Sequence, residues 1–260
     1  MNKILLLFEL FFAKTYFYKI NKFLYLLSLK GMGIDNQEKI VRSGEKKLLN
    51  TLLHRSESQV VIDVGANVGK YAEDVLKYNP NIKLYAFEPH PKTYKKLIEK
   101  SEKLNFEAIN KGCADEIGKL KFYDYASNDG SEHATLLAGV FENIYHKDTI
   151  VYEVDVTTLD NFIQDRKIQK VDLLKIDTEG FEYNVLKGLE QSLKANKIKA
   201  IHFEFNSMNI IGKVFMKDFI NLLPQFNFYR VLPDGLLKIE KDKILLTEIF
   251  GFQNIIAVLN

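Results

Sequence analysis

An apolar run that ends in a glycine-containing turn is the feature that most constrains this chain. Residues 60–64 (Val-Val-Ile-Asp-Val) lead into residues 65–69 (Gly-Ala-Asn-Val-Gly), after which a helix begins. Gly65 and Gly69 have no Cβ, so the backbone there can bend sharply and approach a ligand closely. The next apolar run ends in Glu88, where a carboxylate can accept hydrogen bonds from two ribose hydroxyls. Together, the two motifs predict a nucleoside-binding half-site.

The spacing of the turn indicates which nucleoside binds. Dinucleotide-binding folds use G-x-G-x-x-G, whose glycines bring backbone and helix against a pyrophosphate. This chain instead reads D-x-G-A-N-x-G from Asp63 to Gly69, with Asn67 where pyrophosphate packing favours glycine. The pattern favours S-adenosylmethionine, which carries no phosphate. Two alternatives stay open: an NAD(P)- or nucleotide-sugar-binding oxidoreductase on the same kind of sheet, and a tight turn that binds no ligand.

Composition limits the class of protein. A chain of 260 residues can bury one large core, and α/β domains of this size are commonly single. The net charge of +2 gives no reason to expect a nucleic-acid partner. The single cysteine, Cys113, excludes an internal disulfide framework and a cysteine-based zinc cluster, and we expect it to be a buried, inert thiol. A chain with a single cysteine fits a reducing, cytoplasmic compartment.

Strand and helix signals alternate along the chain. Strand signals fall at residues 59–64, 83–88, 106–110, 171–177, 199–206, 226–232 and 253–259, and helix signals at about 38–55, 68–78, 91–103, 158–165, 181–194 and 214–223. This alternation predicts an α/β fold with a mainly parallel sheet and helices on both faces. Ligands are then expected at the carboxyl ends of the central strands.

The N-terminal 30 residues are rich in Leu, Phe and Tyr but are interrupted by charges. Their longest uncharged run, residues 23–29, is much shorter than the roughly 20 residues that a membrane span needs. No small-x-small cleavage site follows the first apolar block, which disfavours a secretory signal. Two interpretations stay open: helices that dock on the rest of the chain or on a partner, which we favour, and a lysine-bearing aromatic helix on the inner face of a membrane.

A long polar segment interrupts the second half of the fold. Residues 126–149 lie between two strand-like runs, 119–125 and 150–156, and contain several turn-forming residues together with His133 and His146. Polar segments of this length inside a compact domain are usually functional or mobile. We interpret this one as a lid or substrate loop.

The strand expected at 171–177 carries charges where a covered strand should be apolar. Lys175 and Asp177 share one face because side chains alternate along a strand, and Glu179 follows just beyond. An unpaired buried lysine costs several kcal/mol, so Lys175 needs an anionic partner. The alternative is a structural Lys–Asp pair, but carboxylates at this edge of a sheet more often belong to an active site.

The strand expected at 199–206 repeats this anomaly. His202 and Glu204 fall on one face of an otherwise apolar run. We expect His202 to be a core residue and Glu204 to be a partner of Lys175 or a base facing substrate. Asp177, Glu179 and Glu204 together would suit a divalent metal, but no compact ligand motif exists and a metal is not favoured.

These motifs together resemble the FkbM family of S-adenosylmethionine-dependent methyltransferases. The resemblance spans about residues 40–232. It rests on Asp63-Val-Gly-Ala-Asn67-Val-Gly69-Lys-Tyr71, Phe87-Glu88-Pro89-His-Pro91, Thr158-Leu159-Asp160 and Leu174-Lys175-Ile-Asp177-Thr-Glu179-Gly180-Phe-Glu182, with Gly44-Glu45, Gly188 and Phe203-Glu204-Phe205 in support. It implies a Rossmann-like methyltransferase sheet whose last two strands form an antiparallel pair. We therefore expect an N-terminal helical extension over residues 1–55 and a methyltransferase domain over residues 56–260.

The resemblance also implies a reaction and a set of roles. A methyl group passes from S-adenosylmethionine to a hydroxyl of a sugar, glycan or other small acceptor, by in-line transfer. The cofactor-binding set is Asp63, Gly65, Asn67, Gly69 and Tyr71 around the methionine part, Glu88 on the ribose, and Asn110 and Asp115 on the adenine side. The catalytic set is Lys175, Asp177, Glu179 and Glu204, with Glu179 or Glu204 as base and His133 as the loop-borne alternative. A non-catalytic interaction module with the same fold is the remaining alternative.

Overall fold

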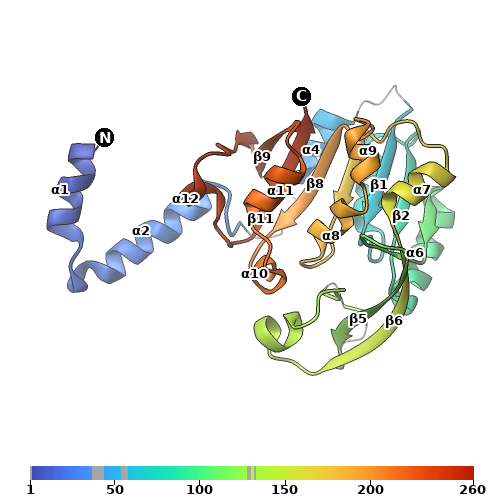
Figure 1. The fold of residues 1–260 in the computed structure, drawn as a ribbon, viewed down its shortest axis with the longest axis horizontal. Coiled ribbons are helices and arrows are strands. Elements are labelled where there is room, and N and C mark those ends of the chain that lie inside the picture. The colour runs from blue at the N-terminus through green and yellow to red at the C-terminus, as the bar shows by residue number, and fades with distance from the viewer. Residues whose placement is uncertain (1, 37–43, 54–57, 128–129, 132) are drawn as a thin grey trace.

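An eight-stranded sheet forms the centre of the molecule, in the order β10-β9-β11-β8-β7-β1-β2-β3 (Figure 1). The computed structural model describes residues 2–36, 44–53, 58–127, 130, 131 and 133–260. The strands are β1 (Val60–Val64), β2 (Lys83–Phe87), β3 (Glu107–Ile109), β7 (Leu173–Ile176), β8 (Ala200–Phe205), β9 (Phe226–Leu232), β10 (Gly235–Lys238) and β11 (Gln253–Leu259). Strands β8, β7, β1, β2 and β3 run parallel to one another, which confirms the mainly parallel sheet.

The antiparallel part lies at one side of this sheet. Strand β11 pairs antiparallel with both β8 and β9, so the last two predicted strands are neighbours, as the resemblance implies. Strand β10 was not predicted; it pairs antiparallel with β9 at the outer edge, and its side chains are mostly exposed. Its short, solvent-facing run lacks the apolar signal that marks a covered strand.

Helices cover both faces of the sheet. They are α4 (Glu45–Leu52), α5 (Lys70–Tyr78), α6 (Pro91–Leu104), α7 (Leu159–Asp165), α8 (Glu182–Lys187), α9 (Glu190–Lys194), α10 (Met208–Gly212), α11 (Met216–Leu222) and α12 (Ile244–Thr247). Leu48 and Leu49 of α4 are buried in the same apolar cluster as Val61 and Ala72, so this helix packs on the sheet although the expected boundary at residue 56 assigned it to the extension. Residues 38–43 and 54–55 of the expected helix over 38–55 lie outside the described residues.

The single helix expected over residues 181–194 is two helices. Helix α8 ends at Lys187 and α9 begins at Glu190. A Cβ on Gly188 would lie 2.0 Å from the carbonyl oxygen of Ala114, so the backbone approach at this break requires glycine. The apolar periodicity continues across the break, which is why the sequence did not reveal it.

A second, three-stranded sheet lies beside the carboxyl ends of the main strands (Figure 1). It contains β4 (Gly112–Cys113), β6 (Thr149–Thr157) and β5 (Gly118–Tyr125), in that order. The segment between β5 and β6 holds a short π-helical turn at Phe141–Tyr145, and Tyr123 forms a bridge with Thr135. Asn128 and Asp129 of this segment lie outside the described residues.

The N-terminal helices project away from the sheet (Figure 1). Helix α1 (Asn2–Phe12) and helix α2 (Tyr18–Gly31) expose nearly all of their described side chains, and Leu29 is the one that is buried. The expectation that they dock on the rest of the chain is therefore wrong: among the described residues, packing begins at the end of α2 with Leu29 and continues through Gly33 and Ile34. Across the described ranges, no helix combines the length and apolar character that a bilayer crossing requires.

Candidate active site

The carboxyl ends of β1, β2, β7 and β8 border a cavity of about 240 Å³. Strand ends in a parallel sheet converge at this edge, where loops rather than helices surround a ligand. Ten of the predicted site residues line the cavity: Asp63, Gly65, Asn67, Tyr71, Glu88, His133, Lys175, Asp177, Glu179 and Glu204. The predicted donor and catalytic sets therefore share one space.

The turn after β1 is held against the loop after β7. Gly65 has φ 83°, and a Cβ at this position would lie 1.7 Å from the carbonyl oxygen of Asp177. The backbone N–H groups of Gly65 and Ala66 donate to the Phe87 carbonyl at 3.0 and 2.9 Å. Glycine is thus required at position 65 both by its φ and by the neighbouring backbone. These contacts fix the floor of the cavity relative to three strands.

Glu88 is held by the backbone on both sides. Its Oε2 accepts from the Asn67 N–H at 2.9 Å and its Oε1 from the His90 N–H at 2.7 Å. Burial raises the pKa of Glu88 to about 7, although both amides favour the charged form. Each carboxylate oxygen has two lone pairs, so one acceptor site on each oxygen remains for a ligand. Asn67 itself has φ 48°, in the left-handed region that asparagine adopts more readily than most residues.

Three polar atoms of the cavity wall are buried without a hydrogen bond. They are Asp63 Oδ2, Tyr71 Oη and Lys175 Nζ. Burial raises the pKa of Asp63 to about 7, and Lys175 opposes this shift. Buried polar groups in folded proteins are almost always paired, so atoms of this kind beside a cavity indicate the place of a polar ligand.

Lys175 is surrounded by carboxylates. Its Nζ lies 3.2 Å from Asp177 Oδ2 and 3.9 Å from Glu204 Oε1, and its side chain is 3% exposed. Burial opposes its charge, but Asp177, Glu204 and Glu45 outweigh burial and hold the pKa of Lys175 above its ordinary value. Burial and the charge of Asp177 raise the pKa of Glu204 well above its usual range, because one ammonium cannot balance all the neighbouring carboxylates. The anionic partner that the sequence required for Lys175 is present.

Glu182, at the start of α8, holds the loop after β7 through hydrogen bonds. Its Oε1 accepts from the N–H and hydroxyl of Thr178 and from the Gly180 N–H, at 2.9–3.1 Å. Glu179 adopts φ 55°, a conformation that costs a residue other than glycine about 1–2 kcal/mol. From above, the Thr135 hydroxyl donates to the Glu179 carbonyl at 2.8 Å. The strained residue therefore lies between two supports.

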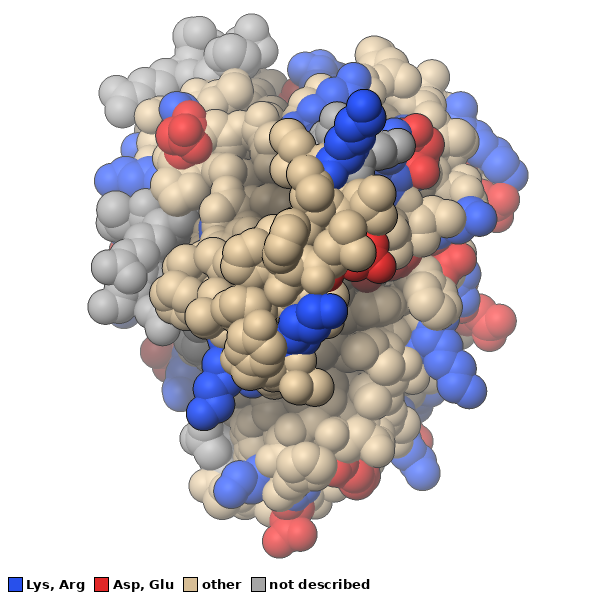
Figure 2. Space-filling model, turned by 90° about the vertical axis from the view of Figure 1, so that its left-hand side faces the viewer, with Lys and Arg blue, Asp and Glu red and all other residues tan. Residues whose placement is uncertain are grey.

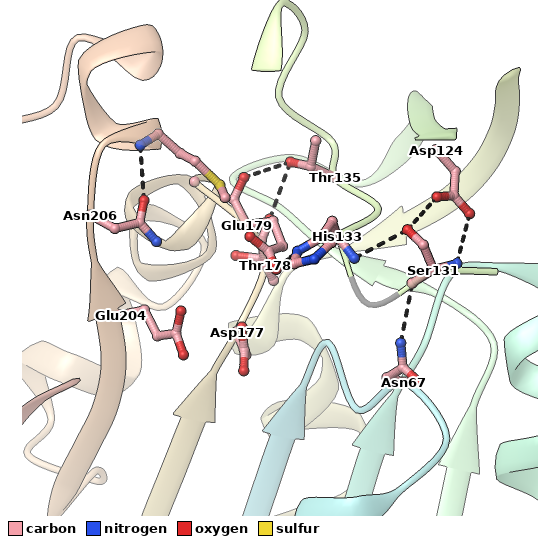
Figure 3. A network of polar contacts seen from close by, with 12 residues as sticks. Asn67, Asp124, Ser131, His133, Thr135, Asp177, Thr178, Glu179, Glu204 and Asn206 are labelled. Carbon is pink, nitrogen blue, oxygen red and sulfur yellow. Dashed lines mark hydrogen bonds and ion pairs between the residues drawn. The ribbon is translucent and has the colours of Figure 1, made fainter. Parts of the chain in front are cut away.

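Glu179 contacts the only predicted site residue of the 126–149 segment, His133. The Nδ1 of His133 lies 3.3 Å from Glu179 Oε1, and the His133 side chain is 44% exposed (Figure 3). Burial raises the pKa of Glu179 and Asp177 adds to the effect, whereas His133 opposes it. Asp177 and Glu204 lie side by side on the neighbouring strands below this pair (Figure 3). The four side chains come from three separate parts of the sequence.

Comparison with known families decides the identity of the fold. Residues 63–230 match the family described as the methyltransferase FkbM domain, a stretch that includes the β1 turn, Glu88 and the loop after β7. The chain belongs to the FkbM methyltransferase family. It is therefore an S-adenosylmethionine-dependent methyltransferase, and the oxidoreductase and non-catalytic alternatives are not supported.

Two relatives of this FkbM methyltransferase have names that state a reaction. It is 23% identical over 195 residues to 2-O-methyltransferase NoeI of Sinorhizobium fredii. The aligned region covers 72% of this chain and 78% of NoeI. It is 28% identical over 157 residues to hexuronic acid methyltransferase AglP of Haloferax volcanii. The aligned region covers 58% of this chain and 59% of AglP. A TehB-like SAM-dependent methyltransferase structure from Corynebacterium glutamicum has a TM-score of 0.44 at 12% identity, and covers 92% of this chain and 97% of that chain.

The charge of the FkbM cavity suits a cationic donor. Seven acidic side chains line it against three lysines: Glu45, Asp63, Asp74, Glu88, Asp177, Glu179 and Glu204 against Lys70, Lys111 and Lys175. A sulfonium ion is attracted to such a lining, and the Asp63 and Tyr71 oxygens that lack a hydrogen bond, with the Lys175 ammonium, match the charged amino and carboxylate groups of a methionine part. The residues present therefore fit S-adenosylmethionine. Within the described residues, no group of three or more His, Cys, Asp or Glu side chains is placed to hold a metal ion.

Three predicted cofactor residues do not line the cavity. The Asn110 side chain donates to the Glu88 carbonyl at 2.8 Å and to the Pro89 carbonyl, so it orders the β2 loop rather than facing a ligand. Asp115 forms an ion pair with Lys187 on α8. Gly69 caps the N-terminus of α5, where a Cβ would lie 2.8 Å from Leu97 Cδ1, so its glycine permits close packing of α5 and α6.

Several cavity residues were not predicted as site residues. Glu45, at the start of α4, lines the cavity and belongs to the Gly44-Glu45 step that the sequence offers as its only signal. Phe252 and Asn254 also line it, but they lie almost two hundred residues from the β1 turn and nothing local marks them. His202 stays outside the lining; its Nε2 lies 3.1 Å from Asn254 Oδ1, as a core histidine should.

Proposed function

We propose that this FkbM methyltransferase methylates a hydroxyl group of a neutral sugar, in a glycan or a small glycoside. The observation that carries the proposal is the His133–Glu179 pair, which lies above Asp177 and Glu204 in the same cavity as the donor-binding turn. O-methylation requires a donor, an aligned hydroxyl and a group that takes the hydroxyl proton. The cavity provides residues for each of these three tasks.

The donor is assigned to the wall formed by β1 and β2. Glu88 accepts hydrogen bonds from the two ribose hydroxyls, using the acceptor sites that the Asn67 and His90 amides leave open. Asp63 and Tyr71 hold the methionine part through oxygens that have no other hydrogen bond, together with the Lys175 ammonium on the neighbouring strand β7. Gly65 and Asn67 shape the turn beneath it. When bound, the donor supplies the activated methyl carbon, and the protein supplies orientation.

His133 is assigned as the general base. Glu179 Oε1 accepts a hydrogen bond from Nδ1–H and so orients the ring and favours the tautomer in which Nε2 takes the proton. The half-exposed position of His133 places it where an acceptor arrives from solvent. Asp177 and Glu204 bind neighbouring hydroxyl groups and align the attacking oxygen with the methyl group.

The chemistry of the acceptor side favours a sugar. Carboxylates of Asp177, Glu179 and Glu204 accept hydrogen bonds from hydroxyl groups. Rings of Tyr125 and Tyr145 pack beside His133, with centroids 6.1 and 5.2 Å from the imidazole, and give the apolar face of a sugar ring a surface to cover. The name of AglP states a hexuronic acid substrate, and the name of NoeI states 2-O-methylation, which is methyl transfer to an oxygen.

The charge of this side favours a neutral sugar over an acidic one. The carboxylate of a uronic acid would face Asp177, Glu179 and Glu204, with Lys175 already held between two of them. Repulsion between the uronic acid carboxylate and these side-chain carboxylates in a buried site opposes binding. We therefore expect the acceptor to differ from the hexuronic acid in the name of AglP.

The test is methyl transfer from labelled S-adenosylmethionine to a panel of neutral hexosides, deoxyhexosides and uronic acid glycosides. We expect methylation of a neutral sugar, with a mass increase on an oxygen, and loss of transfer in His133→Asn. Transfer confined to uronic acids would contradict the charge argument. Transfer to nitrogen or to a non-sugar acceptor alone would contradict the proposed substrate class.

A further inference from the structure

The N-terminal helices present an apolar surface that no other described part of the chain covers. Eight large side chains of α1 are exposed, and they fall on every side of the helix because they are nearly consecutive: Ile4, Leu5, Leu6, Leu7, Phe8, Leu10, Phe11 and Phe12. Helix α2 continues this surface with Ile20, Phe23, Leu24, Tyr25, Leu26 and Leu27. Single exposed apolar residues are ordinary, but a continuous surface of this kind marks an interaction site.

This surface also carries a one-sided charge. Five lysines are exposed between residues 3 and 30, at positions 3, 14, 19, 22 and 30, against one exposed acid, Glu9. Figure 2 looks at this end of the molecule, and the nearest atoms are mostly uncharged, with blue lysines and little red among them. The surface is thus both apolar and cationic, unlike the acidic cavity.

We propose that α1 and α2 bind the surface of a lipid bilayer that contains anionic lipids. Apolar side chains enter the acyl boundary while lysines meet the anionic headgroups, which is the arrangement of helices that lie in a membrane interface. Most of these lysines lie on α2, at positions 19, 22 and 30, with Lys3 at the start of α1 and Lys14 between the two helices, so the charge extends over the whole segment. Tyr16, Tyr18 and Tyr25 are exposed, and tyrosine is enriched at the boundary between water and lipid.

The same charge disfavours a second copy of the chain as the partner. In a symmetric pair the same surface contacts itself, so the lysines of one copy would meet those of the other. An anionic bilayer instead neutralises them. Charge complementarity therefore selects lipid over self-association.

The helices are attached firmly to the rest of the molecule. After α2, Ile34 is fully buried, the Asp35 N–H donates to the Phe252 carbonyl at 2.8 Å, and the Phe252 N–H donates to Asp35 Oδ1 at 3.2 Å. Phe252 also lines the cavity. A bilayer bound by α1 and α2 is thus connected to the cavity wall through two hydrogen bonds. The inference does not depend on which acceptor is methylated.

The test is sedimentation of the full chain with vesicles, either of phosphatidylcholine alone or of equimolar phosphatidylcholine and phosphatidylglycerol. We expect binding to the anionic vesicles only, weakened by salt. The triple variant Lys14→Gln, Lys19→Gln, Lys22→Gln should bind about a hundredfold more weakly, because each lysine near an anionic surface accounts for about a fivefold change. The matched control is Lys95→Gln, Lys96→Gln, Lys103→Gln, three exposed lysines of α6, which should bind like the parent.

A second variant tests the apolar contribution. Phe11→Ser with Phe23→Ser should weaken binding at least about tenfold while S-adenosylhomocysteine binding, measured in the same preparation, stays unchanged. Equal binding to both vesicle types, an equal loss in both lysine triples, or no vesicle binding at all would overturn the proposal. Sedimentation velocity without vesicles completes the test: a dimer that the Phe variant dissociates, together with no vesicle binding, assigns the surface to a second copy.

Discussion

The two walls of the cavity are built differently. The donor wall is fixed by backbone: Gly65 lies against the Asp177 carbonyl, and Glu88 accepts from two main-chain amides. The acceptor wall is assembled by side chains on the 126–149 segment, where His133 contacts Glu179 and is 44% exposed. A wall made of backbone contacts tolerates little change, whereas a wall made of side chains on a loop can vary without disturbing the sheet.

The acceptor wall is nevertheless anchored to the donor wall. Asp124, fully buried, accepts from the Gly130 and Ser131 amides and from the Ser131 hydroxyl. The side-chain amide of Asn67 in turn donates to the Ser131 carbonyl at 3.3 Å (Figure 3). The donor turn and the segment that carries His133 are therefore coupled through one short chain of hydrogen bonds. Variants can separate what each wall does.

The largest expected effect is on the acceptor wall. His133→Asn removes the proposed base, and we expect kcat to fall about 10²–10⁴-fold, the usual contribution of general base catalysis. Steady-state transfer to the acceptor found in the panel measures it. Glu142→Gln, an exposed change in the same segment, is the control and should leave kcat unchanged. A normal kcat in His133→Asn would remove this residue from the mechanism.

On the donor wall, Gly65→Ala should destabilise the fold itself. The added Cβ overlaps the Asp177 carbonyl and the residue must keep φ 83°, so we expect a loss of about 3 kcal/mol or more in the free energy of unfolding. Chemical denaturation measures it. Gly118→Ala is the matched control, because no atom lies within 4 Å of a Cβ there. Equal stability of the two variants would show that the donor wall is less rigid than described.

Glu88→Gln should weaken donor binding, and it also loses one of the two backbone hydrogen bonds at this position because an amide nitrogen cannot accept from the Asn67 or His90 N–H. The change removes charge-assisted hydrogen bonds to the ribose, each typically 1.5–3 kcal/mol, so S-adenosylhomocysteine should bind about 10–100-fold more weakly. Ligand-induced thermal shifts measure the loss, with the exposed Glu102→Gln as control. An unchanged shift would place the ribose elsewhere in the cavity.

The smallest expected effect is a pH dependence of donor binding. The pKa values of Glu88 and Asp63 are both about 7, raised by burial, and the ligand needs their charged forms. Affinity for S-adenosylhomocysteine should therefore be full well above pH 7, drop to about a quarter at pH 7, where each group is half protonated, and approach a fall of about a hundredfold per pH unit well below it, because both groups then take up a proton. Titrations across this range measure the slope, which should be shallower in Glu88→Gln. Tighter binding at acidic pH would contradict the assigned roles.

The difference between local signals and tertiary packing explains which parts of the fold and of the site the sequence could predict. Glycines, a strand-end acid and buried charges are local signals, so the parallel sheet and the residues of the β1 turn and the β7 loop were predicted. Asn110 and Asp115 do not line the cavity although their neighbours at residues 111–113 do, because proximity in sequence to a strand end does not fix side-chain direction. Phe252 was missed because its place depends on the antiparallel insertion of β11 between β8 and β9, which only tertiary packing determines.

The most direct test of the account is calorimetric titration of S-adenosylhomocysteine into His133→Asn and Glu88→Gln, each compared with the parent protein. If the donor and acceptor walls have separate tasks, His133→Asn binds with the affinity of the parent, and Glu88→Gln binds about 10–100-fold more weakly. Comparable losses in the two variants, or a loss confined to His133→Asn, would contradict the assignment of donor and acceptor to opposite walls of the cavity.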